Sequence, residues 1–164
     1  MESFSEAKLA YMMVTCDPVS IMTHFVGRTI VCGGSGCTLC GFERARPKHY
    51  CLAVIARREV LVEMCQSLYD CAREAFRVAH AVAWPGVIVQ CTRTSPRRSW
   101  QLQTSAFKPE LVAQMPIARA IVGWLSDLYR VPVSTEPEAL GAWIRRAAAA
   151  HASLHVRALL PGMA

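Results

Sequence analysis

The sequence predicts an α+β protein in which strands carrying an inserted metal knuckle come first and helices follow. Before Phe107, β-branched and apolar residues alternate or run together in short segments that are typical of strands. From Phe107 on, apolar residues recur at helical spacing. Between the first two predicted strands, three cysteines crowd around a glycine-rich turn, which is typical of a metal site.

Length and composition limit the class of protein. At 164 residues and 18.1 kDa, the chain has the size of one domain with room for an extension. Hydrophobic residues make up 53% of it, which excludes a disordered chain. No apolar stretch reaches the roughly 18 residues of a membrane span. Because the N-terminal residues do not form a secretory signal, we expect a soluble protein in the reducing cytoplasm, where clustered cysteines bind metal more often than they pair.

The segments up to residue 63 are predicted to be mostly strands. Residues 1–15 have an apolar side that suits a short helix or a strand, and residues 19–31 are predicted as one strand with a bulge at Gly27. Residues 49–56 are apolar on both faces, as expected of a central strand. In residues 59–63, acidic and apolar side chains alternate, which fits either a strand end or a helix start.

A helix and a hairpin come next. Apolar residues at helical spacing predict an amphipathic helix that ends near residue 81. Residues 87–92 and 99–104 then form a predicted β-hairpin around a basic loop at 94–98.

Helices are predicted for the rest of the chain. One runs from Phe107 towards a stop at Val131-Pro132. A second begins with Thr135 as its N-cap, with Glu138 completing a capping box, and continues towards His151.

The predicted metal knuckle lies within residues 24–51. Cys32, Cys37 and Cys40 form a C-x4-C-x2-C run, and the four residues between the first two are Gly-Gly-Ser-Gly. Glycine reaches positive φ without steric penalty, so this turn can fold back and aim several sulfurs at one point. Structural zinc takes four tetrahedral Cys or His ligands, for which C-x2-C is the usual half-site. We therefore predict a structural zinc ion here.

Three residues are candidates for the fourth ligand. His24 lies on the strand that enters the knuckle, whereas His49 and Cys51 lie on the strand that leaves it. We favour His24 and keep the other two as alternatives. Because four protein ligands leave no open position for a substrate, the site is expected to be structural rather than catalytic.

Positive charge is concentrated in two stretches. The chain carries 18 basic and 12 acidic residues, for a net charge of +6. Residues 24–58 hold six basic residues and one acid, Glu43, while residues 75–109 hold five basic residues and no acid. Fifteen of the 18 basic residues are arginine, whose planar guanidinium binds phosphate bidentately and stacks on bases. The distribution indicates a nucleic-acid surface, with a merely solvated basic face as the plainer alternative.

The order His24, Cys32, Cys37, Cys40, closed by one C-x2-C pair, resembles the zinc-containing single-stranded DNA-binding proteins of phages, in which such a site braces an OB-fold. The stretch GVIVQCTRTSPRRSWQLQ at 86–103 is similar to the hairpin of such a barrel. The resemblance spans about residues 19–105. It implies an OB-like five-stranded β-barrel domain at 1–106, with the zinc knuckle at 24–51, and a helical extension at 107–164 that packs on it or on a partner.

The implied function is binding of single-stranded nucleic acid, which is DNA in the family that the chain resembles, largely without sequence specificity. The residues themselves leave DNA and RNA as open alternatives. Basic side chains are assigned to phosphates: Arg28, Arg44, Arg46, Lys48, Arg93, Arg97 and Arg98. Aromatic side chains are assigned to bases: Tyr50, Trp100 and, as a further candidate, Phe42. For Trp100, a place in the core is an equal alternative.

A second function stays open. The apolar C-terminal helices suit a protein-interaction subunit of a larger nucleic-acid-processing complex, or self-association. No catalytic or nucleotide-binding motif is present in the sequence, so we predict that the protein is not an enzyme.

Overall fold

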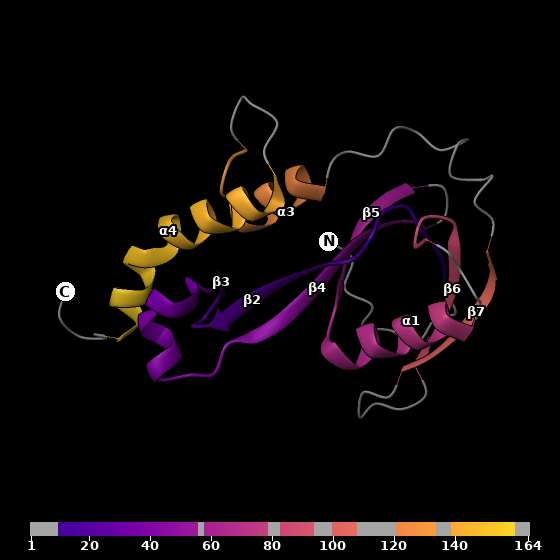
Figure 1. Cartoon of the computed structure of the whole chain (residues 1–164), viewed down its shortest axis with the longest axis horizontal. Coiled ribbons are helices and arrows are strands. Elements are labelled where there is room, and N and C mark those ends of the chain that lie inside the picture. The colour runs from indigo at the N-terminus through magenta and orange to yellow at the C-terminus, as the bar shows by residue number, and fades with distance from the viewer. Residues whose placement is uncertain are drawn as a thin grey trace. The chain divides into compact units, whose positions relative to one another are not determined.

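The computed structural model (Figure 1) describes residues 10–55, 58–78, 83–93, 100–107, 121–133 and 139–159. The chain forms two compact units. The first unit holds residues 1–19 and 49–118, and the second holds residues 20–48 and 119–164. The units therefore do not follow the predicted division at residue 106, because the knuckle segment groups with the C-terminal helices.

In the part of the chain that the structure describes, the first unit is an antiparallel sheet accompanied by helix α1. In chain order, its elements are β1 (Ala10–Val14), β4 (Arg46–Ile55, in this unit from His49), β5 (Arg58–Met64), α1 (Gln66–Val78), β6 (Val87–Arg93) and β7 (Trp100–Phe107). The strands pair in the order β5-β4-β1-β6-β7. In the described part of the chain, the sheet is open, so the closed five-stranded barrel of the prediction is not seen.

Strand β4 is central in this sheet, as its composition predicts. It pairs with β1 on one side and with β5 on the other. Tyr50, Cys51, Leu52 and Ala53 are all buried, because both faces of a central strand are covered. The core also contains side chains of the neighbouring strands and of α1.

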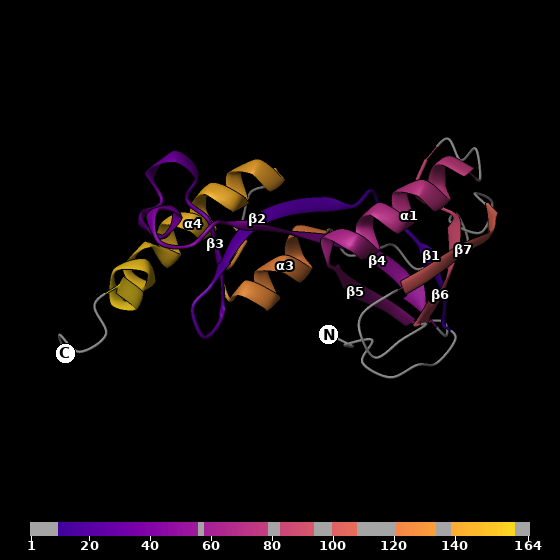
Figure 2. The ribbon, with the colours of Figure 1, turned by 90° about the horizontal axis from the view of Figure 1, so that it is seen from below.

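Residues 58–64 form strand β5, so residues 59–63 belong to a strand and not to the start of a helix. Helix α1 consequently begins at Gln66, where the Tyr69 N–H donates to the Cys65 carbonyl at 2.9 Å. Figure 2 shows α1 running alongside the hairpin of β6 and β7. The antiparallel pairing of β6 with β7 confirms the predicted hairpin.

Among its described residues, the second unit combines a small hairpin, two short 3-10 helices and two α-helices. Its elements are β2 (Val19–Phe25, in this unit from Ser20), β3 (Thr29–Val31), η1 (Gly34–Gly36), η2 (Thr38–Gly41), the first residues of β4, α3 (Ile121–Tyr129) and α4 (Leu140–Leu159). None of the helices in the described ranges is long and apolar enough to cross a membrane.

The prediction of one bulged strand over residues 19–31 is wrong, because the chain reverses there. β2 and β3 pair antiparallel, with Phe25 opposite Thr29. Gly27 has φ +74° at the turn, and the Val26 N–H donates to the Arg28 carbonyl at 3.0 Å. A positive φ is what glycine permits at little steric cost, and here it serves a tight turn rather than a bulge.

Helices α3 and α4 pack through apolar side chains at the predicted spacing. Val122, Leu125 and Tyr129 of α3 are buried. The rings of Tyr129 and Trp143 have centroids 5.7 Å apart, and the Trp143 indole N–H donates to the Val131 carbonyl at 3.2 Å. Phe107, where the first of these helices was predicted to begin, is the last residue of strand β7, and residues 108–120 lie outside the described residues.

Helix α4 begins at Leu140 and continues to Leu159, past the expected end near His151. The predicted cap residues Thr135 and Glu138 lie outside the described residues. The residues after His151 are mostly alanine, leucine and arginine, which have high helix propensity, so nothing local ends the helix there.

Helix α4 also covers the knuckle segment. It lies beside β3 and η2 in Figures 1 and 2. The buried His151 accepts a hydrogen bond at Nδ1 from the Val31 N–H at 3.3 Å. This contact explains why a segment from the first third of the chain belongs to the same unit as the C-terminal helices.

Candidate metal centre

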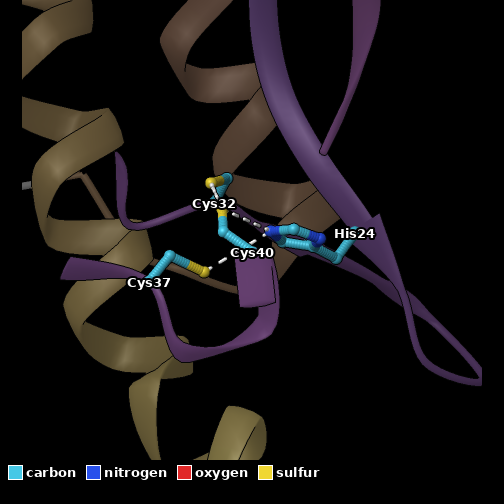
Figure 3. Close-up of side chains that lie close together, drawn as sticks. All are labelled: His24, Cys32, Cys37 and Cys40. Atoms are coloured by element: carbon cyan, nitrogen blue, oxygen red, sulfur yellow. Dashed lines mark hydrogen bonds between the residues drawn. The ribbon is translucent and has the colours of Figure 1, made fainter. Parts of the chain in front are cut away.

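Four side chains of the second unit converge on one point: His24, Cys32, Cys37 and Cys40. Their ligand atoms all lie within 4.8 Å of one another, and Figure 3 shows the His24 ring and the three sulfurs pointing toward a common centre. His24 comes from the end of β2, Cys32 follows β3, and the other two lie in and beside η2. The group predicted from the sequence is thus brought together as one possible metal site.

The separations within the cluster are short. His24 Nε2 lies 3.4 Å from Cys37 Sγ and 3.5 Å from Cys40 Sγ. The sulfurs of Cys32 and Cys40 are 3.5 Å apart. Three of the six pairs of donor atoms are thus as close together as the ligands of one small cation, and all four atoms lie within 4.8 Å, which makes the cluster a possible metal site.

The glycine turn produces this convergence. Gly34 has φ +72°, and the Cys37 N–H donates to the Gly34 carbonyl at 3.0 Å, which closes a tight turn. The Gly34 N–H in turn donates to Cys32 Sγ at 3.4 Å. Because an L side chain at positive φ is strained, the predicted need for glycine is borne out at this position.

The cluster is buried on one side and open on the other. His24 is only 2% exposed, and Cys32 and Cys37 are almost as well covered, whereas Cys40 faces solvent. The imidazole therefore anchors the cluster from inside, and Cys40 forms its outer edge.

The thiols differ in acidity. Burial acts to raise the pKa of Cys37, but hydrogen bonds from the backbone of Gly33, Leu39 and Cys40 outweigh it, so the net pKa is lowered. A hydrogen bond from Cys40 to Cys32, followed by desolvation and by the nearby thiolates, raises the pKa of Cys40 to about 11. Since the thiolate is the form that binds metal, Cys37 is the better prepared ligand and Cys40 must lose its proton on binding.

The two alternative fourth ligands have other roles, in the first unit. His49 is buried, its Nε2 lies 3.0 Å from Gln66 Oε1, and its ring stacks on Tyr69 with centroids 3.9 Å apart. Cys51 is fully buried among the apolar side chains of the core. Neither residue belongs to the cluster, so His24 alone of the three candidates fits as the fourth ligand.

Four of the predicted phosphate contacts lie in the same unit as the cluster. Arg28 is exposed at the tip of the β2–β3 turn, and Arg44 and Arg46 are exposed after η2. Lys48 is half-buried. Residues from Arg46 on already belong to strand β4, which thus begins three residues before the predicted start at residue 49.

The remaining predicted contacts belong to the first unit. Tyr50 is 0% exposed, and its hydroxyl donates to Glu63 Oε2 at 3.1 Å. A base cannot stack on a buried ring, so Tyr50 is not one of the base contacts. Arg93 and Trp100 are the last pair of the β6–β7 ladder, and their side chains lie outside the described part of the structure. Arg97 and Arg98, in the loop beyond that pair, are outside the described residues entirely.

The sequence prediction missed Phe25, which is 67% exposed. In a strand whose side chains alternate strictly between two faces, Phe25 falls on the same face as Ile21 and Thr23, both of which are buried. Successive side chains of a strand point to opposite faces, so a ligand at His24 that faces the cysteines turns its neighbour Phe25 away from them. The same rule puts Phe25 on the face of the buried Ile21 and Thr23, so no pattern in the sequence identifies it as a surface residue.

Comparisons with known proteins return nothing similar. No protein-family model, no curated protein and no solved structure matches the chain. Function is therefore inferred from the cluster and from the placement of the charged and aromatic side chains.

Proposed function

We propose that the protein binds single-stranded nucleic acid through basic loops braced by a structural zinc ion. The observation that carries the proposal is the position of the two basic stretches in the strand order. Each falls in a connection that contacts nucleic acid in OB-folds.

The first unit has the strand order of a Greek key. If β1, β4, β5 and β6 are counted as strands one to four, their order across the sheet is 4-1-2-3, with α1 in the long connection from three to four. Strand β7 is the fifth and lies beside β6. An OB-fold is a five-stranded, partly open Greek-key barrel, and this order supports an open, OB-like sheet.

In OB-folds, nucleic acid contacts the loops between strands one and two and between strands four and five. The connection between β1 and β4 holds the metal cluster together with Arg28 and Arg44. The connection between β6 and β7 holds Arg97 and Arg98. Both of the loops that would contact nucleic acid therefore carry positively charged side chains.

Zinc fits the donor set of the cluster. Around a tetrahedral zinc ion, thiolate sulfurs lie about 3.8 Å apart and a sulfur lies about 3.5 Å from an imidazole nitrogen, given Zn–S and Zn–N bonds of about 2.3 and 2.0 Å. The separations of 3.4 and 3.5 Å in the cluster are close to these values. When bound, zinc supplies cross-linking between β2 and the knuckle, and His24 and the three cysteines together fill all of its positions.

Binding is attributed to electrostatics in the first place. The guanidinium groups of Arg28, Arg44 and Arg46 are exposed, and Glu43 is the one acid among residues 24–48. Each phosphate that an arginine neutralises releases a condensed counterion, so affinity falls as salt rises.

Titration of a fluorescently labelled oligothymidylate at about 50 and about 200 mM salt tests the proposal. We expect saturable binding that weakens steeply over this range, with weaker binding to a duplex of equal length and to an RNA strand. If no single strand binds at the lower salt concentration, the proposal is wrong and the interaction-subunit alternative takes its place.

A double variant tests the surface itself. R28A/R44A removes two predicted phosphate contacts and should reduce the slope of log affinity against log salt by about 1.4 for a single strand. The matched control is R73A/R77A, which removes the same charge from exposed positions of α1 that pair with Asp70 and Glu74. Equal slopes for the two variants would exclude Arg28 and Arg44 from the binding surface.

A further inference from the structure

Two phenylalanines of the second unit are strongly exposed beside the metal cluster. Phe25 is 67% exposed and Phe42 is 77% exposed. Phenylalanine is among the residues that proteins bury most often, and each exposed ring leaves an apolar face available to a ligand. The inference drawn from them deepens the proposed function and rests on it.

Regular backbone holds both rings. Phe25 is the last residue of β2 and pairs with Thr29 across the hairpin. Phe42 directly follows η2, and its N–H donates to the Leu39 carbonyl at 3.0 Å. Because neither residue lies on a long loop, binding would have to order little further backbone at these two positions.

The metal cluster links the two positions. Phe25 directly follows the ligand His24, and Phe42 lies two residues after the ligand Cys40. The ligand atoms of His24 and Cys40 lie 3.5 Å apart. A metal ion held by both residues therefore fixes the two backbone segments that carry the rings.

Each ring has an exposed arginine close by in the sequence. Arg28 lies three residues after Phe25 in the same hairpin, and Arg44 lies two residues after Phe42. An aromatic face next to a guanidinium is the combination that binds unpaired nucleotides, with the base on the ring and the phosphate on the charge. An apolar protein partner has no group that requires the arginines, whereas the phosphates of a nucleic acid do. The charge therefore favours a nucleic-acid strand as the ligand.

We propose that Phe25 and Phe42 are two stacking positions for unpaired bases, and that Arg28 and Arg44 bind the adjoining phosphates. The ligand class follows from this arrangement. A ring can stack on a base only after the base has left its own stack, so the pair selects single strands over duplexes. Stacking accepts every base, so it gives little sequence preference.

The variants F25L and F42L test the inference. Leucine keeps an apolar side chain at the surface but has no aromatic face. Stacking on one aromatic residue is worth about fivefold in affinity or more, so each variant should weaken oligothymidylate binding at least about fivefold. The salt slope should stay that of the unchanged protein, because no charge is removed. V78A, which trims an exposed apolar side chain on α1, is the control and should bind normally.

A strand with abasic sites completes a double-mutant cycle. If the rings stack on bases, F25L and F42L lose affinity for the normal strand but little or none for a strand that lacks bases. Equal losses on both strands would overturn the inference. The metal content of each variant, measured alongside, separates a lost ring contact from a damaged cluster.

The two proposals fail differently. No binding by the unchanged protein contradicts the proposed function and this inference with it. Tight, salt-dependent binding by the unchanged protein, with the same affinity in F25L and F42L, overturns the stacking positions and leaves the proposed function standing.

Discussion

His24 of β2 is buried in the cluster, on a face of the strand that also carries the exposed Ser20 and Met22. Thr23 and His24 are both buried, although neighbouring residues of a strand normally point to opposite faces. Thr23 also donates from Oγ1 to the Arg46 carbonyl at 3.1 Å, which accounts for its burial on the other face. Thr23 and Phe25 share the face opposite His24, yet only Phe25, the last residue of the strand, is exposed.

Replacement of one ligand should abolish tight metal binding. C37S removes the thiol whose pKa is lowered, and three remaining ligands hold zinc far more weakly than four. We expect metal content after purification to fall from about one ion per chain to a small fraction, together with a lower melting temperature. C65S is the control, because this exposed cysteine lies outside the cluster. Equal metal content in the two variants would contradict the ligand assignment.

Metal affinity should rise with pH. In the metal-free protein, the pKa of Cys40 is raised to about 11, so its thiol is protonated at neutral pH and binding must displace that proton. Protons therefore compete with the metal more strongly as pH falls. Competition with a zinc chelator at pH 6, 7 and 8 should show weakening affinity toward the acid end, after correction for the chelator's own protonation. An affinity that does not change with pH would rule out a protonated Cys40.

At the scale of elements, the turn between β3 and η2 depends on a single backbone conformation. Gly34 has φ +72°, which an alanine reaches only with strain of about 1–2 kcal/mol, although space for a Cβ is available. G34A should lower the free energy of unfolding by this amount and weaken metal binding. The control is G36A, where there is room for a Cβ and φ is not in the positive range that side chains avoid. Denaturant unfolding of both variants checks the difference, and equal stabilities would refute it.

Helix α4 holds β3 through one buried hydrogen bond. H151A removes the acceptor of the Val31 N–H and leaves that donor unsatisfied, which costs about 1–3 kcal/mol. The exposed Arg145 on the same helix provides the control, because R145A should change stability by no more than about 0.5 kcal/mol. Urea midpoints that coincide for the two variants would show that the contact contributes nothing.

Elements with a clear local period were predicted well. The central strand β4, the β6–β7 hairpin and the buried face of α3 follow from patterns over a few residues. The reversal at Gly27 was missed, because a glycine inside an alternating segment is compatible with both a bulge and a turn. Only the pairing of Phe25 with Thr29 distinguishes them, and no local pattern encodes it.

At the scale of the whole molecule, the ligand set was predictable and the division into units was not. The four residues of the candidate metal site lie within one short stretch whose chemistry is visible in the sequence. The second unit, by contrast, joins residues 20–48 to residues 119–164. That grouping depends on packing such as His151 against Val31, which leaves no periodic signal in either segment.

Metal removal should affect the two units unequally. Without the ion, the amides of Val31 and Cys37 in the second unit should exchange their hydrogens faster, because the segments that the ligands join lose their cross-link. The amide of Thr15, which donates to the Leu52 carbonyl in the first unit, should keep its protection. Hydrogen exchange followed by mass spectrometry, with and without a chelator, measures both. A uniform loss of protection would mean that the units unfold together.

The hydrogen bond between Val31 and His151 joins residues that lie 120 positions apart. Ribosomes add about 5–20 residues per second, so roughly 6–24 s pass between the synthesis of these two residues. His24 and Cys40 are only 16 positions apart, so the full ligand set leaves the ribosome well before the helix that covers β3. The knuckle is therefore exposed to metal ions and to oxidants while the chain is still being synthesised. Whether its thiols are metal-bound, free or oxidised at that time determines the conformation of the segment on which α4 later packs.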